Sequence, residues 1–470
     1  MDTSPASGDR GSYNGRMKPI RTIVATACAL CLPLGAPSVF AEAPGPGPET
    51  LPAVMPKVKP TPAPAPPPPH GGERPVPGQM VEPIDDVAAA ARLTTASNAF
   101  ALDLWKTQSA TRGNLAMSPT SLTGALAMTW SGAKGKTEAQ MRTALHLQDA
   151  TNLVAAGWRR LTSGLQDPSR KLKLRMVNRL FGEQSFAFER SFLNLTDAGF
   201  GAPLEKLDFL SNAEAQRAHI NDWVAKQTES RIKDLLASGT IDTNTKLVLV
   251  NAIYFLADWA NPFKREQTRD EKFIVDKTTT KNVATMHQQG TLRTTKSGKA
   301  SVLELPYRGD DTAMWIILPD AVNGLAALEA GLSAKQIATW NANLKAEELS
   351  LSLPKFEVNP TGSLMLNEAL IKLGMKDAFN EKVANFEGIS KNKDAKQRLF
   401  ITSVVHKAFV KVDEKGTEAA AATAVVMGTR SAMRLPDKEF QVDHPFLFMI
   451  VDKKTGLVLF MGRVVDPSQT

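Results

Sequence analysis

Hydrophobic positions recur with two different periods along this chain, and the period changes from its first half to its second. Apolar residues spaced three or four apart, as on one face of a helix, occur at Leu93 to Lys106, Ser121 to Met128 and Ala213 to Leu236. Apolar runs typical of buried strands occur at Leu247 to Phe255, Ala313 to Leu318, Leu349 to Leu353, Leu447 to Val451 and Leu457 to Met461. The last two runs flank a turn-rich sequence, residues 452–456, which predicts a hairpin. Helices early and strands late predict an α+β domain.

A segment near the C-terminus, residues 413–429, combines two opposing local preferences. Four alanines after Thr417 and Glu418 favour helix, whereas the run from Thr423 to Met427 carries β-branched residues that favour strand. If the segment is a strand, one face is small and uncharged throughout, with Thr417, Ala419, Ala421, Thr423, Val425, Met427 and Thr429. Such a face could enter an existing sheet, although composition alone favours an Ala-rich surface helix or a low-complexity loop.

The sequence from Glu414 to Ala422 resembles the reactive-loop hinge of the inhibitory serpins, a family of serine protease inhibitors. In that family Glu-any-Gly-Thr/Ser-Glu is followed by small residues, as it is here. Five other stretches resemble serpin motifs: residues 114–128 (helix B), 220–224 (helix F), 251–263 (a central strand ending at Trp), 442–450 (the C-terminal signature) and 460–467 (the last strand). The resemblance extends from about Leu93 to Pro467, in family order.

This resemblance implies a serpin fold with three β-sheets, eight or nine helices and an exposed reactive-centre loop. It also implies that the protein is not an enzyme. The target protease attacks a bond in the loop and forms an acyl-enzyme, and the cleaved loop then inserts into the central sheet before deacylation. The same resemblance implies a covalent complex with a serine protease.

The scissile bond of serpins usually lies fourteen residues after the hinge glycine. Counting from Gly416 places it at Arg430-Ser431. An arginine at this position enters a deep pocket with an acidic floor, which predicts a trypsin-like target. Arg434 is the alternative, because the stretch from Ser431 to Phe440 is longer than is common in the family.

Three groups of site residues follow from matching positions. The predicted hinge consists of Glu414, Gly416, Thr417, Glu418, Ala419, Ala420, Ala421 and Ala422. The serpin shutter, a polar cluster beneath the centre of the sheet, is matched by Ser118, Ser121, Asn251 and His406. Trp259 matches the breach, where the hinge first enters the sheet. Taken alone, His406 fits a core or surface histidine better than a shutter residue, so its assignment rests on the resemblance, and Trp259 fits an ordinary core or edge aromatic equally well.

The N-terminal 83 residues have a different composition from the rest. A basic start at Met17 to Arg21, an apolar stretch at Thr22 to Leu34 and small residues ending at Ala41 predict a signal peptide, within residues 1–41, cleaved after Ala41. The protein is therefore expected to be secreted or periplasmic. Residues 42–83 are rich in proline, which predicts a semi-rigid linker before a serpin domain at residues 92–470.

Both cysteines, Cys28 and Cys31, fall inside the predicted signal peptide. The mature chain would then have no cysteine, which excludes a disulfide framework. Lipidation of one of these cysteines is the alternative, although the residues before them match a lipobox poorly.

Charge and motif content argue against several other classes of function. The chain carries a net charge of +8 with both signs interspersed, and it has no aromatic-interleaved basic patch, so no nucleic-acid partner is expected. The six histidines lack metal-ligand spacing and no phosphate loop is present, so neither a metal nor another cofactor is expected. No apolar stretch has the length of a membrane span. A monomer is expected.

Two alternatives remain open. The serine penicillin-interacting enzymes have three short motifs, and matches occur at residues 131–134, 390–392 and 454–456. Their chemistry needs a serine at the start of a helix, whereas Ser131 follows an apolar helical run, so chance matching accounts for these motifs better. Within the serpins, the alternative is a non-inhibitory binding or chaperone-like member. Such members often lose the small-residue hinge, which this chain keeps.

Overall fold

The computed structural model describes residues 85–108, 111–359, 362–392, 398–417 and 438–469, except for the side chains of Val177, Asn251 and Ala252. All of these residues belong to one compact unit, Met80–Thr470. The first helix begins at Asp86, ahead of the predicted domain start at residue 92. In this part of the chain, no helix has the length and apolar character that crossing a membrane requires.

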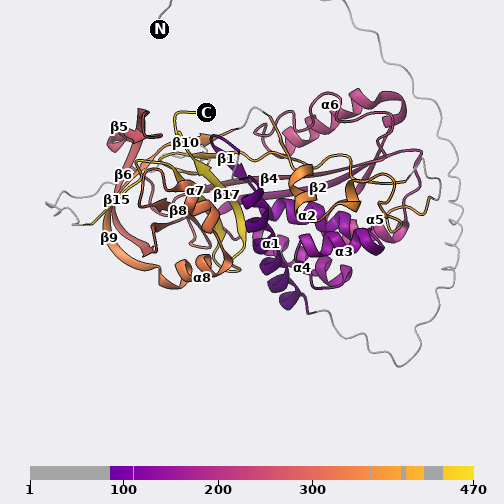
Figure 1. Cartoon of the computed structure of the whole chain (residues 1–470), viewed down its shortest axis with the longest axis horizontal. Coiled ribbons are helices and arrows are strands. Elements are labelled where there is room, and N and C mark those ends of the chain that lie inside the picture. Colours follow the sequence, from indigo (N-terminus) through magenta and orange to yellow (C-terminus); the bar gives the residue numbers. More distant parts are fainter. Residues whose placement is uncertain (1–84, 109–110, 360–361, 393–397, 418–437, 470) are drawn as a thin grey trace, which may run out of the picture. The chain divides into compact units, whose positions relative to one another are not determined.

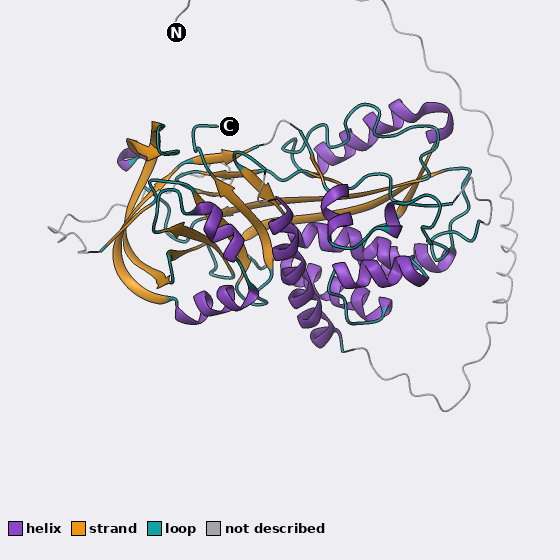
Figure 2. Cartoon of the chain, in the orientation of Figure 1, coloured by secondary structure: helices purple, strands orange, loops and turns teal. Residues whose placement is uncertain are grey.

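Nine α-helices lie within the described residues, most of them around one end of the body (Figure 2). They are α1 (Asp86–Gln108), α2 (Pro119–Trp130), α3 (Gly135–Ala144), α4 (Thr151–Leu165), α5 (Arg190–Phe200), α6 (Phe209–Gln227), α7 (Leu325–Gly331), α8 (Ala334–Asn343) and α9 (Asn367–Lys372). Helix α2 begins where the Ser118 hydroxyl accepts a hydrogen bond from the Ser121 amide, with Pro119 at the first helical position. Both features favour a helix start at this point.

The largest sheet contains nine strands. In spatial order they are β1 (Leu115–Met117), β17 (Val458–Val464), β16 (Phe446–Asp452), β8 (Thr312–Pro319), β7 (Ala300–Pro306), β6 (Thr280–Ser297), β9 (Lys345–Pro354) and β15 (Glu439–Gln441), and β5 (Arg269–Ile274) also pairs with β6. Strands β16 and β17 form the predicted hairpin, and every residue of both is buried. Their continuous apolar runs follow from burial on both faces.

The second sheet has six strands and carries the predicted hinge. Its spatial order is β10 (Phe356–Val358), β13 (Val410–Val412), β14 (Gly416–Thr417), β4 (Leu247–Asp258), β2 (Leu172–Glu183) and β3 (Leu204–Leu207). A two-stranded third sheet pairs β11 (Leu364–Met365) with β12 (Val405–His406). Three sheets and nine helices within the described part confirm the predicted α+β architecture.

Strand β4 has a hydrophobic core on each of its faces. Ile253 and Phe255 belong to the main core, which also includes α2, whereas Val250 belongs to a second core with Ile220 and Val224 of α6. Figure 1 shows α6 on one side of β2 and β4, and α2 on the other. Because successive side chains of a strand point to opposite faces, one apolar strand supplies both cores.

The helix predicted over Ala213 to Leu236 is wrong in its last turns, because α6 ends at Gln227. Glu229, Ser230 and Asp234 adopt positive φ angles, which a helix cannot contain. The Asn221 amide accepts a hydrogen bond from the Leu236 backbone and donates one back to it, at 2.9 Å each. The apolar residues after the helix are therefore buried as a loop held against α6.

Candidate hinge seat and shutter

The predicted hinge begins inside the six-stranded sheet. Gly416 and Thr417 form β14, which lies antiparallel to both neighbours, with Thr417 opposite Ala257 of β4 and Val412 of β13. A Cβ atom on Gly416 would lie 2.0 Å from the Ala257 carbonyl oxygen, so only glycine permits this close approach of the two backbones. The hinge glycine is therefore required by strand packing as well as by flexibility.

The side chain of Thr417 is 2% exposed and meets a buried tyrosine. The Thr417 and Tyr307 hydroxyl oxygens are 2.5 Å apart, at hydrogen-bond distance. Burial raises the pKa of Tyr307, while its hydrogen bond with Thr417 acts in the opposite direction. The phenol therefore stays protonated and can donate to the Thr417 oxygen at ordinary pH.

Trp259 supports this tyrosine and also binds the hinge backbone. Its ring stacks on the Tyr307 ring, with centroids 4.6 Å apart and planes 10° from parallel. The Trp259 indole N–H donates to the Asp413 carbonyl at 2.9 Å, and its backbone N–H donates to the Lys415 carbonyl at 2.7 Å. The predicted breach tryptophan thus contacts the hinge directly.

Glu414 is held by two side chains from distant parts of the chain. Its carboxylate is 2.9 Å from the Lys355 ammonium and accepts a hydrogen bond from the Thr268 hydroxyl at 2.9 Å. Burial by itself raises the pKa of Glu414, but the hydrogen bonds, above all that from Lys355, outweigh it and hold the pKa below its usual value. We call Tyr307, Trp259, Lys355 and Thr268 the hinge seat.

The predicted shutter residues meet beneath the same sheet. The imidazole Nε2 of His406 accepts a hydrogen bond from the Ser118 backbone N–H at 3.0 Å, and both residues are buried. The Ser118 hydroxyl donates to the Leu459 carbonyl at 2.6 Å. His406 is thus tied to the first turn of α2, which itself is tied to β17.

The described hydrogen bonds of the shutter side chains go to backbone groups. The imidazole is satisfied by a backbone amide, and the Ser121 hydroxyl is buried without a hydrogen-bond partner among the described residues. Asn251 belongs to β4, opposite Asn178 of β2, but its side chain lies outside the described part. A backbone amide at a helix start is a stronger competitor for a nearby acceptor than a hydroxyl with several alternative rotamers.

Burial lowers the pKa of His406 to about 4, from an ordinary value of 6.5. Below about pH 6.5 the unfolded chain therefore binds a proton that the folded protein does not bind, and stability falls as the pH drops toward about 4. We expect this one residue to cost on the order of 3 kcal/mol of unfolding free energy across that window.

Urea denaturation at several pH values tests this prediction. In the variant His406→Gln the side chain does not titrate, so its unfolding free energy should fall less than that of the wild type between pH 7 and pH 5. Parallel curves for the two proteins would contradict the assignment of a buried neutral imidazole.

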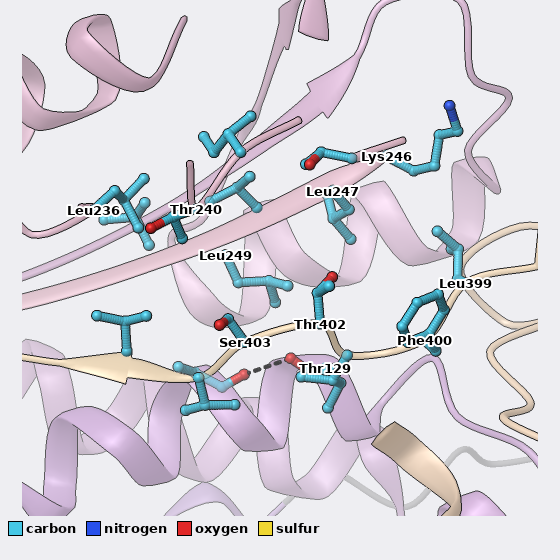
Figure 3. Close-up of a pocket in the computed structure, with 18 of the residues that line it drawn as sticks. Thr129, Leu236, Thr240, Lys246, Leu247, Leu249, Leu399, Phe400, Thr402 and Ser403 are labelled. Atoms are coloured by element: carbon cyan, nitrogen blue, oxygen red, sulfur yellow. Dashed lines mark hydrogen bonds between the residues drawn. The ribbon is translucent and has the colours of Figure 1, made fainter. Parts of the chain in front are cut away.

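A cavity of about 530 Å³ lies beside β4, beyond the hinge seat. Residues 247–250 of β4 form one wall and residues 398–406 the other, and α2, part of residues 235–246, and Glu381, Phe386 and Ile389 also line it. Figure 3 shows Leu247 and Leu249 on the strand facing Thr402 and Ser403 across this space, with Thr129 on the helix. Leu247 and Leu249 are only half-buried, which is unusual for leucines in the middle of a sheet.

The cavity lies where β4 has only one neighbouring strand. Strand β2 pairs with β4 from Leu247 to Ala257, whereas β14 pairs only with Ala257 and Asp258. Among the described residues, the remaining edge of β4 therefore has no strand partner. An unpaired edge next to a cavity is able to receive one more strand.

Several predicted site residues cannot be placed. Glu418, Ala419, Ala420, Ala421, Ala422, Arg430 and Ser431 lie outside the described residues, so the alanine part of the hinge and the reactive bond stay predictions.

Sequence reasoning missed three of the four hinge-seat residues, Tyr307, Lys355 and Thr268. Each lies more than fifty residues from the hinge in sequence, and none belongs to a motif that points to it. Within the described residues, no group of three or more His, Cys, Asp or Glu side chains is placed to hold a metal.

The alternative enzyme motifs do not form a nucleophile site. Ser131 is the C-terminal cap of α2, and its hydroxyl donates to the Met128 carbonyl at 2.7 Å. Lys454 lies in the turn between β16 and β17, where its ammonium pairs with Asp311 at 2.7 Å. Neither residue has the position that acylation of a serine requires.

Comparisons with known proteins agree with this geometry. The family model described as serpin, serine protease inhibitor, matches residues 95–467. Leukocyte elastase inhibitor of Sus scrofa is 41% identical over 386 residues, covering 80% of this chain and 100% of that protein.

Two solved structures are similar across the same region. Uncleaved ovalbumin has a TM-score of 0.72 at 29% identity, covering 80% of this chain and 100% of its own. Human thyroxine-binding globulin, complexed with thyroxine, has a TM-score of 0.72 at 28% identity, covering 81% of this chain and 100% of its own. With Gly416 and Thr417 of the hinge inside the six-stranded sheet and a family match over residues 95–467, the chain belongs to the serpin family.

Proposed function

We propose that this protein is a secreted inhibitor of trypsin-like serine proteases that traps the acyl-enzyme by inserting its cleaved loop into the six-stranded sheet. The family is one of protease inhibitors, so the prediction that the chain is not an enzyme is confirmed. The observation that carries the proposal is the placement of β14. Gly416 and Thr417 of the hinge already pair with β4, and the strand edge beyond them is unpaired within the described part.

The register of β14 gives the position that each later loop residue would take. If the strand continued antiparallel from Thr417 opposite Ala257, Ala424 would lie opposite Val250 and Met427 opposite Leu247, the first residue of β4. Strand β4 thus offers pairing partners for loop residues as far as Met427, which is three residues before Arg430. Cleavage after Arg434 would leave four more loop residues without a partner on β4 than cleavage after Arg430 would. The length of β4 therefore favours the bond Arg430-Ser431.

Insertion would be driven by the hydrogen bonds of a completed sheet. Each inserted residue gains ladder hydrogen bonds worth about 0.5–1.5 kcal/mol net, so a dozen residues gain on the order of 10 kcal/mol. Burial of the half-exposed leucines beside the cavity adds to this. The intact protein is therefore metastable, and cleavage of the loop releases the stored free energy.

Specificity and location are supported by sequence features outside the described residues. Arg430 suits a primary pocket with an acidic floor, which is the pocket of trypsin-like proteases. The basic start, apolar stretch and small residues ending at Ala41 support export, and the mature protein would act outside the cytoplasm as a monomer. The covalent partner is a serine protease in that compartment.

Two other functions have specific support. The relative from Sus scrofa is named an elastase inhibitor, and elastase has a small primary pocket that suits a residue such as Val426. The human structural neighbour is named for binding thyroxine, so a serpin fold also serves a binding protein. The intact small-residue hinge favours inhibition over binding alone.

The test is to incubate the mature protein separately with trypsin, chymotrypsin and elastase, followed by SDS gels and mass mapping of the cleaved loop. We expect a covalent adduct with trypsin and a new terminus after Arg430. An adduct with elastase alone would replace the trypsin-like proposal. Rapid cleavage without an adduct by any of the three would favour the non-inhibitory alternative.

Arg430→Ala is expected to lower the rate of trypsin inhibition at least about a hundredfold, since it removes the charge that pairs with the acidic pocket. Arg434→Ala is the matched control and should leave the rate unchanged. If Arg434→Ala were the damaging change, the reactive bond would lie four residues further along the loop.

A further inference from the structure

The hydroxyl of Tyr307 is in an unusual position for a buried tyrosine. The side chain is fully buried, following the end of β7, and its ring lies between Phe255 and Trp259, with centroid distances of 5.1 and 4.6 Å. Within the described residues, its hydroxyl makes one hydrogen bond, to the Thr417 hydroxyl. The two aromatic neighbours fix the direction of the ring, so the hydroxyl is aimed at the place that the hinge occupies.

The two ends of this hydrogen bond depend on each other. If the hinge left the sheet, the Tyr307 hydroxyl would lose its one hydrogen-bond partner among the described residues. We expect this loss to shift the equilibrium between seated and unseated hinge about tenfold toward the seated state. Thr417 likewise makes its one side-chain hydrogen bond, within the described part, to Tyr307. The pair therefore stabilises the state in which β14 is formed.

We propose that Tyr307 is a positioning residue that keeps the hinge seated in the sheet, so that loop insertion starts from a strand whose first pairs exist before cleavage. The proposal rests on the trapping function proposed above. Forming the first pairs of a new strand is the unfavourable step, because backbone freedom is lost before many hydrogen bonds are gained. A seated hinge has already passed that step, so insertion is faster relative to deacylation of the acyl-enzyme.

The consequence is kinetic. A serpin that inserts quickly forms complex, and one that inserts slowly releases the protease and is left cleaved. The ratio of released, cleaved inhibitor to covalent complex therefore measures the rate of deacylation relative to the rate of insertion. Tyr307 should affect this ratio and leave the rate of loop acylation unchanged, because its buried side chain meets β14 and does not belong to the loop that the protease binds.

The variant Tyr307→Phe tests the proposal, since it removes the hydroxyl and keeps the ring stack. We expect the ratio of cleaved inhibitor to complex with trypsin to rise about tenfold. The rate of acylation, measured by stopped flow, should stay at the wild-type value.

Tyr254→Phe is the matched control. The Tyr254 hydroxyl hydrogen-bonds Glu229 at 3.2 Å, on the face of β4 opposite to that of Phe255, which packs on Tyr307. This variant should keep the wild-type ratio, and an equal rise in both variants would reduce Tyr307 to a general contributor to stability and overturn the proposal.

The double variant Tyr307→Phe/Thr417→Val separates this hydrogen bond from packing. Thr417→Val alone leaves the phenol unpaired and should raise the ratio, whereas the double variant replaces both partners by apolar groups and should be no worse than either single change. If the rise in the ratio for the double variant equalled the product of the rises for the two single variants, the two residues would act independently. That result would overturn the proposal.

Hydrogen exchange of the intact protein, without any protease, distinguishes a failure of this inference from a failure of the proposed function. The peptide that contains Gly416 and Thr417 should exchange about tenfold faster in Tyr307→Phe and at the wild-type rate in Tyr254→Phe. If exchange shows these rates but no protease forms an adduct, the role of Tyr307 in seating the hinge is supported and the proposed trapping function is refuted. If exchange is unchanged in Tyr307→Phe, the hinge seat itself is refuted.

Discussion

Thr417→Arg is expected to convert the protein from an inhibitor into a substrate. The Thr417 side chain is 2% exposed between β4 and β13, and its hydroxyl hydrogen-bonds Tyr307. A guanidinium in that place would lose its hydration without gaining a carboxylate, since Glu414 is already paired with Lys355. The cost of several kcal/mol would favour an unseated hinge, so the first strand pairs would have to form after cleavage, against that cost.

SDS gels after mixing with trypsin measure this outcome. Thr417→Arg should give cleaved inhibitor and free protease, with no covalent adduct. Thr417→Ser keeps the hydroxyl and its small size, so it should form adduct as the wild type does. A wild-type yield of adduct from Thr417→Arg would show that insertion does not pass through this position.

Cleavage of the loop is expected to make the protein far more stable than it was before. A dozen loop residues entering the sheet contribute on the order of 10 kcal/mol, which corresponds to roughly 10–20 °C in melting temperature for a chain of this size. The half-buried Leu247 and Leu249 become covered in the same step, because the new strand would pass beside the first residues of β4.

Calorimetry of intact protein and of protein nicked after Arg430 measures this gain. A nick in the proline-rich linker, residues 42–83, is the control and should leave the melting temperature unchanged. Nicked Thr417→Arg should also gain little, because its loop enters poorly. Equal melting temperatures of intact and loop-nicked wild type would mean that the fold stores no free energy for trapping.

Much of the fold could be predicted from the sequence. Apolar spacing predicted α1, α2 and most of α6, and apolar runs predicted β4, β8, β9, β16 and β17. Strand β2 was missed, because the alternating residues from Leu172 to Met176 carry charges that suggest a surface segment. The helix after Gln227 was overpredicted, because a loop buried against α6 has the same apolar spacing as a helix.

The candidate site, like the fold, was predicted only in part from the sequence. The sequence indicated that Gly416, Thr417, Trp259 and His406 belong to a hinge, a breach and a shutter, and the structure brings Trp259 to the hinge and His406 to Ser118. It did not indicate that the imidazole pairs with a backbone amide, or that Glu414 pairs with Lys355. Motif matching assigns positions, whereas hydrogen-bond partners depend on which groups reach each acceptor in the folded chain.

The sequence by itself determined what the hinge is made of: a glycine, a threonine and a run of alanines, small and uncharged enough to enter a sheet. Only the tertiary structure decided what the hinge meets. Tyr307 is 110 residues from Thr417, and Lys355 is 59 residues from Glu414. Side-chain size and backbone preference are properties of each residue and its neighbours, so they can be read locally. The contacts of a buried hydroxyl are set by the packing of strands that are distant in sequence, and no local pattern encodes them.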